Sequence, residues 1–119
     1  MTGVFVLTRF RVPEAETAEF EDAARAAIAV LSARPGAESV DLVRNLDDPD
    51  LWAIVGRWAD VGSYRRALGG MESRMVVMPL LSRAIDEASA YLDPGEVGVN
   101  VPRGDAESGS ADWSVPGDR

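Results

Sequence analysis

Residues 51–60 read Leu51-Trp52-Ala53-Ile54-Val55-Gly56-Arg57-Trp58-Ala59-Asp60. Branched and aromatic residues dominate this stretch, and apolar side chains fall on both of its alternating faces. A strong turn signal, Asp47-Asp48-Pro49-Asp50, comes directly before it. The pattern predicts a strand from Leu51 to about Ala59 that is buried on both faces and is joined to the preceding strand by a short hairpin loop.

The segments on the N-terminal side predict a strand, a helix and a second strand. Residues 4–12 are rich in branched and aromatic types, and Pro13 ends that strand and opens a helix. The helix carries one apolar stripe, formed by Phe20, Ala24, Ala27, Ile28 and Leu31. Arg34-Pro35-Gly36 ends it, and residues 38–46 predict a strand. Val40, Leu42 and Leu46 are expected to share one face of that strand.

The segments on the C-terminal side predict a helical region and a last strand. Asp60 can cap a helix that covers residues 61–68, and Gly69-Gly70 breaks it. Residues 71–81 are helical in tendency, although Pro79 is expected to kink or end that helix. Residues 85–92 predict a fourth strand. Ala88, Ala90 and Leu92 are expected to share one face of this strand.

The order of these elements is β-α-β-β-α-β, which is the ferredoxin-like split unit of the α+β class. We therefore expect residues 1–92 to form a four-stranded antiparallel sheet with helices on one face. The strands are apolar on both faces, and helices can cover only one, so the other face is expected to meet a second copy in a homodimer that forms an α/β barrel.

Residues 93–119 are rich in Gly, Pro, Ser and Asp, which is typical of a tail. Val97, Val99 and Val101 alternate with polar or small residues, a pattern that favours a short edge strand at 97–101. Trp113 is an unusual residue to leave in water. A strand that pairs with a neighbouring subunit and a loose acidic tail both remain open as interpretations.

Composition excludes several classes of function. The 119 residues carry a formal net charge of −8, which disfavours nucleic acid and anionic membrane surfaces as partners. Cysteine and histidine are both absent, which removes thiolate chemistry, the commonest general base and the usual zinc and haem ligands. No apolar run is long enough to span a bilayer and no basic leader is visible, so the cytoplasm is the expected location.

The residues quoted above also resemble a known family. The strand at 4–12, the helix exit Arg34-Pro35-Gly36-Ala37, the strand ending in Trp58 and the following Tyr64 together look like the antibiotic biosynthesis monooxygenase (ABM) family, over roughly residues 3–92. The resemblance implies a dimeric α/β barrel with a pocket between each sheet and its helices. It also implies oxidation of phenolic rings by molecular oxygen without metal or flavin. The haem-degrading branch of the family fits this sequence poorly, because that branch relies on a helix histidine and this sequence has no histidine.

Candidate site residues follow from side-chain chemistry and from this resemblance. Tyr64, Arg57 and Asn45 are candidate catalytic residues, because a phenol, a guanidinium and an amide can each hold an oxyanion. Trp58 matches the family's aromatic residue and would form a stacking wall. The remaining expected substrate-binding residues are Thr8, Arg9, Met75 and Met78. Each also has a purely structural interpretation, as core filler, turn residue or surface arginine.

Two functions are consistent with this set. The first is cofactor-free, monooxygenase-like oxidation of a small aromatic or quinonoid compound, with no metal site. The alternative is a non-catalytic homodimeric module that binds a hydrophobic small molecule or a protein partner. A cavity with polar groups beside Trp58 favours the enzyme, and a space filled by Met75, Met78 and Phe20 favours the module.

Overall fold

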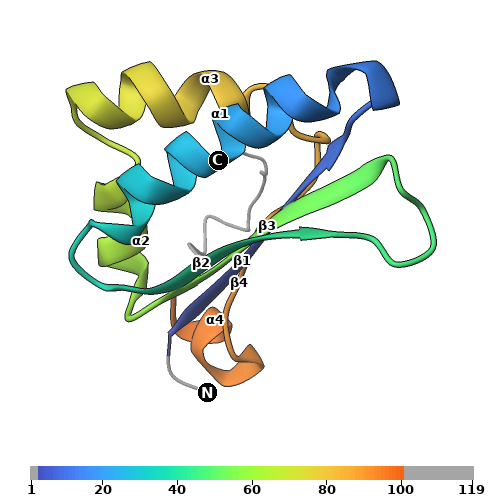
Figure 1. Ribbon diagram of the computed structural model, residues 1–119. Helices are drawn as coiled ribbons and strands as arrows, with labels where there is room; N and C mark the ends of the chain where they lie inside the picture. Colours follow the sequence, from blue (N-terminus) through green and yellow to red (C-terminus); the bar gives the residue numbers. More distant parts are fainter. Residues whose placement is uncertain (1–2, 101–119) are drawn as a thin grey trace.

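The computed structural model describes residues 3–100 and contains one four-stranded antiparallel sheet (Figure 1). Its strands are β1 (Val4–Arg11), β2 (Ala37–Arg44), β3 (Leu51–Trp58) and β4 (Ala90–Tyr91). The order across the sheet is β2-β3-β1-β4, so the first strand lies between the third and the fourth. This arrangement confirms the predicted α+β, ferredoxin-like fold.

The helices are shorter and more varied than the pattern predicts. They are η1 (Glu14–Glu16), α1 (Thr17–Ser32), α2 (Val61–Ala67), η2 (Ser73–Val77), α3 (Met78–Leu81) and α4 (Pro94–Asn100). Figure 1 shows α1 and α3 together on one face of the sheet, as expected. No helix among residues 3–100 is long and apolar enough to cross a membrane.

Pro79 does not end its helix. It lies in the first turn of α3, where a missing N–H is tolerated, and the irregularity falls one turn earlier, in the π-helical η2. Ser73 is fully buried there. Its hydroxyl donates to the carbonyl of Ala67 at 2.6 Å and accepts from the Arg34 guanidinium at 2.9 Å, which ties η2 to the ends of α1 and α2.

The core lies between the sheet and the helices. In the antiparallel register of β1 and β3, Val4 pairs with Trp58 and Phe10 with Trp52. Phe20 of α1 packs onto this face, with its ring centroid 5.1 Å from Phe10 and 5.6 Å from Trp52. Trp52 is therefore a core residue, and its burial anchors α1 to the sheet.

Gly36 explains why the chain leaves α1 with a Pro-Gly pair. Its φ of +90° is unfavourable for any residue with a Cβ atom. A Cβ built there would also overlap the side chain of Ser63 in α2. The backbone carbonyl of Gly36 accepts a hydrogen bond from Ala59 N–H at 2.8 Å, so this glycine joins the start of β2 to the start of α2.

Two details of the predicted strands are wrong. Leu46 does not share the inner face of β2, because the strand ends at Arg44 and Leu46 lies in the hairpin loop with 96% of its surface exposed. The predicted strand at 97–101 is helical as far as it is described, since α4 covers Pro94–Asn100. Val101 and Trp113 lie outside the described residues.

The fourth strand is also much shorter than predicted. Only Ala90 and Tyr91 pair regularly with β1. Before them, Leu7 N–H donates to Ser89 O at 2.7 Å and Ile85 N–H donates to Arg9 O at 2.9 Å, so residues 85–89 lie opposite residues 7–9. Residues 85–89 therefore do not continue the register that Ala90 and Tyr91 make with β1, and this segment forms a bulge at the sheet edge.

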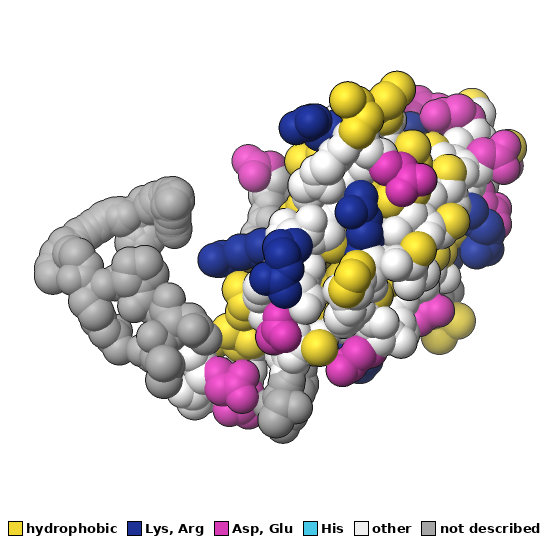
Figure 2. Space-filling model, turned by 90° about the vertical axis from the view of Figure 1, so that its left-hand side faces the viewer, with side chains coloured by type: hydrophobic (Ala, Val, Ile, Leu, Met, Phe, Trp, Pro, Cys, Tyr) yellow, Lys and Arg dark blue, Asp and Glu magenta, His cyan; other side chains and the backbone are white. Residues whose placement is uncertain are grey.

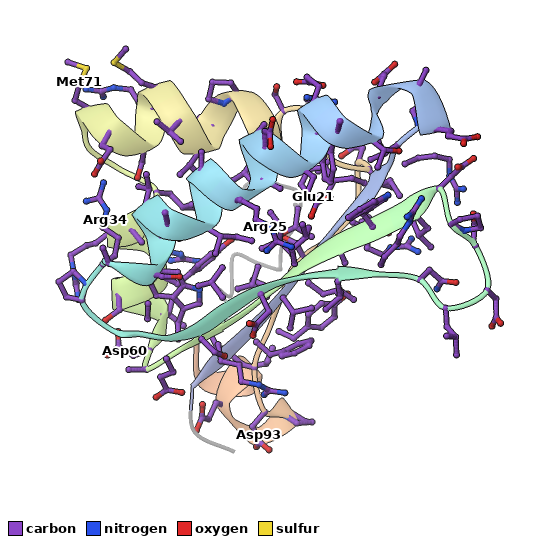
Figure 3. All side chains as sticks on the ribbon, in the orientation of Figure 1. Glu21, Arg25, Arg34, Asp60, Met71 and Asp93 are labelled. Carbon is purple, nitrogen blue, oxygen red and sulfur yellow. The ribbon has the colours of Figure 1, made fainter. Side chains whose placement is uncertain are left out.

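The second face of the sheet, opposite α1 and α3, carries apolar side chains (Figure 3). Of the described helices, the short α4 lies on that side, near the end of the sheet where β1 begins (Figure 1). Phe5, Leu7 and Val55 are half-buried there, and Val43 and Tyr91 are exposed. The Phe5 ring contacts that of Tyr91 at 6.5 Å and lies under the guanidinium of Arg57 at 4.9 Å. The long helix α1 and the helix α3 thus lie over one apolar face, as the sequence predicts, and these apolar side chains lie on the other.

Candidate functional site

A small internal cavity lies between the sheet and the helices. Its volume is ≈ 30 Å³, which is room for about two water molecules. The lining comes from β1, α1, β2, β3, α2, η2 and α3: Val6, Thr8, Ala27, Leu31, Val40, Ile54, Gly56, Trp58, Tyr64, Leu68, Val77 and Leu81. None of these side chains is charged, so any ligand in the cavity meets an apolar wall with a few hydrogen-bonding groups.

Trp58 and Tyr64 form the aromatic side of this cavity. Their ring centroids are 6.0 Å apart with an angle of 56° between the planes. Trp58 is 2% exposed and is held against Gly56, where a Cβ atom would lie only 3.0 Å from the indole nitrogen. A side chain at position 56 would push the indole aside by a few tenths of an ångström, so Gly56 leaves the indole room to pack closely against the strand.

The Tyr64 side chain is half-buried and keeps its hydroxyl group protonated over a wide pH range. Burial raises the pKa of Tyr64 above its ordinary value of 10.0, and a hydrogen bond with the Ser89 side chain offsets only part of that effect. The hydroxyl is therefore a hydrogen-bond donor at neutral pH rather than a base. Asp60 places Tyr64 by capping α2, with its carboxylate accepting from Ser63 N–H at 2.7 Å.

A larger pocket at the sheet edge adjoins the inner cavity. It has a volume of ≈ 380 Å³ and is walled by the bulged segment 85–89, the end of α3 and the middle of β1. Thr8, Tyr64 and Leu81 line both spaces. We call the two spaces the inner cavity and the outer pocket, and these three residues stand between them.

The outer pocket carries charged groups, but they pair with one another. Both Nε and Nη2 of Arg9 donate to the carboxylate of Glu87 at 2.7 Å. This bidentate pair raises the pKa of Arg9 and lowers that of Glu87. Asp86 also lines the pocket, so the acidic groups outnumber the basic one there.

Two of the three predicted catalytic residues lie away from both spaces. Arg57 is on the open face of the sheet, because it alternates with Gly56 and Trp58, which line the cavity. Asn45 follows the end of β2, where its amide oxygen accepts from the backbone N–H groups of Asp47 and Asp48 at 2.9 and 2.7 Å. Only Tyr64 of the three lies at the cavity, so the prediction of one site containing all three does not match their positions.

The predicted substrate-binding residues divide in the same way. Trp58 and Thr8 line the inner cavity, and Thr8 and Arg9 line the outer pocket. Met75 and Met78 do neither, because they lie on the solvent side of their helix, 70% and 41% exposed. Met71, 65% exposed, points away from the sheet in Figure 3. Figure 2, which shows the left-hand side of Figure 1, has a group of hydrophobic side chains at the top and a mixture of charged and hydrophobic side chains over the rest.

Three residues at the site escape the sequence reasoning. Leu81 follows Val77 at helical spacing, a signal that could have placed it on the inner side of its helix. Glu87 and Ser89 carry no such signal, since their position depends on the register of the bulged segment against β1. Within residues 3–100, no group of three or more acidic side chains is placed to hold a metal ion.

Comparison with known proteins matches these features to one family. The model of the antibiotic biosynthesis monooxygenase family matches residues 3–74. A comparison with curated proteins found no match. SnoaB from Streptomyces nogalater, a cofactor-independent oxygenase, is 25% identical with a TM-score of 0.66, over 78% of this chain and 94% of SnoaB. A conserved protein from Methanosarcina mazei shares the fold, with 20% identity and a TM-score of 0.66 over 76% of this chain and 92% of that one. The chain belongs to the antibiotic biosynthesis monooxygenase family.

Proposed function

We propose that this protein oxidises a small phenolic or quinonoid ring with molecular oxygen, without a metal or flavin cofactor. One observation supports the proposal most directly. Trp58 and Tyr64 meet at an apolar cavity between the sheet and the helices, and a wider pocket at the sheet edge adjoins this cavity. The similarity to SnoaB, a cofactor-independent oxygenase, supports the same chemistry.

Each residue at the cavity has a role in this proposal. The Trp58 indole, fixed against Gly56, forms a flat wall on which an aromatic ring stacks. The Tyr64 hydroxyl, kept protonated by its raised pKa, donates to the oxyanion that develops on the ring. The Thr8 hydroxyl lies on the same wall as a second polar group. The apolar remainder keeps water away from the reacting carbon.

The reaction is balanced for a ring that carries an acidified CH₂ group, as anthrones do. The CH₂ group loses a proton to solvent, because no side chain that lines the inner cavity is a base. The resulting carbanion forms a C–O bond with dioxygen, and the peroxide anion takes a proton back from solvent, which gives a hydroperoxide. The O–O bond then breaks with loss of water, and the carbon becomes a carbonyl. One oxygen atom ends in the product and the other in water, so the substrate itself supplies the electrons. The protein has to orient the ring and stabilise the anion.

The open face of the sheet suggests that the protein works as a homodimer. Phe5, Leu7 and Val55 form a half-buried apolar surface on the side of the sheet opposite α1 and α3. A second copy placed sheet to sheet would remove these side chains from water, and a two-fold axis requires one surface only. Arg57 would then lie inside the dimer interface rather than at the catalytic cavity.

A second candidate function is a module that binds a hydrophobic molecule without changing it. The observation in its favour is that no charged side chain lines the inner cavity, so the lining offers no general base. Under this function the same cavity would bind a ring, but oxygen would not be consumed.

Oxygen uptake with a panel of phenols, naphthols and anthrones tests the proposal. We expect uptake with at least one anthrone above its spontaneous oxidation. Replacing Tyr64→Phe should lower the rate about 10-fold or more, since one donor to an oxyanion contributes about 10²-fold in well-studied enzymes. Trp58→Phe should raise KM more than it lowers kcat.

The chain contains a matched control for the tyrosine variant. Tyr91 is the other tyrosine, and its hydroxyl bonds the carbonyl of Ala88 at 3.3 Å, away from the inner cavity. Tyr91→Phe removes the same atom and should leave the rate unchanged. Full activity in a Tyr64→Phe/Trp58→Phe double variant would contradict the proposed site. Ring binding with no uptake over the whole panel would favour the binding module.

A further inference from the structure

The inner cavity and the outer pocket differ greatly in size. The inner cavity, at ≈ 30 Å³, is far below the volume of about 150 Å³ that accepts benzene in an engineered cavity. The outer pocket, at ≈ 380 Å³, is large enough for a ring. The two spaces share three wall residues, so a ring that passes from the outer pocket to Trp58 must displace part of this wall.

The wall has three members, and they differ in how firmly they are held. Thr8 lies in the middle of β1, opposite Ile54 of β3. Its neighbours in β1, Leu7 and Arg9, form backbone hydrogen bonds with the segment 85–89 on the other side of the strand. The Tyr64 ring packs on Trp58. Leu81 is the last residue of the short helix α3, is half-buried, and is followed by a turn. Leu81 is the member that can move with the least loss of packing.

The backbone before Leu81 also departs from regular geometry. α3 follows directly on the π-helical η2, and Val77 at the end of η2 lines the inner cavity together with Leu81. π-helical turns are rare and often occur at functional sites. The backbone on this side of the inner cavity is thus irregular, and two adjacent turns, η2 and α3, supply the side chains of Val77 and Leu81 to its lining.

We propose that Leu81 is the gate between the two spaces and sets the size of ring that reaches Trp58. The inference rests on the proposed ring-binding function of the same site. The ring passes Leu81 and lies against the indole, while the rest of the ligand stays in the outer pocket. There the charge of Arg9 is neutralised by Glu87 and Asp86 adds a negative charge, so the outer end of the ligand is not anionic, and a hydroxyl or carbonyl group fits this pocket.

Anaerobic calorimetry on the full chain tests the gate without requiring turnover, with phenol and 1-naphthol as probes. In Leu81→Ala we expect the ratio of 1-naphthol to phenol affinity to rise at least 5-fold. In Leu81→Phe we expect it to fall at least 5-fold, because the larger side chain narrows the passage. The second variant keeps the test valid if the alanine variant does not fold. A second pair of probes tests the charge of the outer pocket. 4-Hydroxy-1-naphthoate, which carries a carboxylate, should bind at least 10-fold more weakly than 1-naphthol, which does not.

Leu42→Ala is the matched control, since Leu42 is also half-buried against the core but lines neither space. It should leave the ratio unchanged. An unchanged ratio in both Leu81 variants, an equal change in Leu42→Ala, or no binding of either probe to the wild type and Leu81→Ala would overturn the gate. Parallel oxygen uptake separates the two ideas. A gate effect without uptake counts against the oxidation alone, and uptake without a gate effect counts against the gate alone.

Discussion

The ring of Tyr64 in α2 lies 6.0 Å from the ring of Trp58 at the end of β3, so two residues close in sequence form one side of the inner cavity. The connection between them is short because Asp60 caps α2 directly after the strand. The turn thus fixes an aromatic pair that the rest of the fold then encloses.

The burial of Tyr64 predicts a late ionisation of its hydroxyl. Its pKa is raised, so the protonated form stabilises the folded protein fully below pH 10.0, and this contribution is lost as the pH rises through the folded-state pKa. Ultraviolet titration of tyrosinate should show one group ionising above that value. The late component should disappear in Tyr64→Phe and persist in Tyr91→Phe, and its persistence in Tyr64→Phe would refute the assignment.

Gly36→Ala should destabilise the protein strongly. The substitution adds strain at a φ of +90° and an overlap with Ser63, and each such backbone or packing effect amounts to about 1–3 kcal/mol. Denaturant unfolding should show a lower midpoint. Gly69→Ala is the control, because a Cβ at Gly69 would meet only the carbonyl of Arg66 at an ordinary 3.5 Å. Equal effects at the two positions would contradict this explanation.

The ion pair at the outer pocket predicts a change in stability with acid. The pKa of Glu87 is lowered by Arg9, so the pair stabilises the folded protein above the ordinary glutamate value of 4.5 and this is lost as the pH falls through the folded-state pKa. Glu87→Gln should therefore lower the Tm slightly at neutral pH and leave it unchanged in strong acid. Thermal unfolding from neutral pH to well below 4.5 measures the difference. A difference that grows towards acid pH would reverse the sign we expect.

The open face of the sheet predicts that one charge separates the proposed dimer. Val55→Glu places a second carboxylate directly opposite Asp41 in the pairing of β2 with β3, and a like-charged pair in an interface opposes association by about 3 kcal/mol or more, which is about 100-fold in Kd. Sedimentation of the wild type should give a dimer and of the variant a monomer. Met75→Glu, on an exposed helix face, should remain dimeric. A monomeric wild type would exclude this interface.

The sequence predicts the fold well because the deciding signals are local. The alternating apolar residues of β3, the Asp60 cap and the Pro-Gly exit at Gly36 each act within a few residues. The site is only partly predictable for the opposite reason. Trp58 and Thr8 follow from strand alternation, whereas the outer pocket arises where residues 85–89 lose register against β1, a pairing between distant parts of the chain.

The misplaced residues show the same limit. Arg57 was grouped with Tyr64 by chemistry, but strand alternation places it on the opposite face from Trp58. Met75 and Met78 occur at a spacing that is typical of a core stripe, yet Val77 and Leu80 fill the core and the methionines face solvent. Hydrophobicity alone does not decide which of two apolar stripes on one helix faces the sheet. That choice depends on the shape of the opposing surface.

The outward position of the methionines has a consequence for the durability of the protein. The chain has no cysteine, and no residue that lines the inner cavity contains sulfur. An oxidant therefore finds the thioethers of Met71, Met75 and Met78 at the surface, where conversion to the polar sulfoxide adds a group that water already solvates. For a protein proposed to handle dioxygen, the atoms easiest to damage are those whose damage disturbs the interior least.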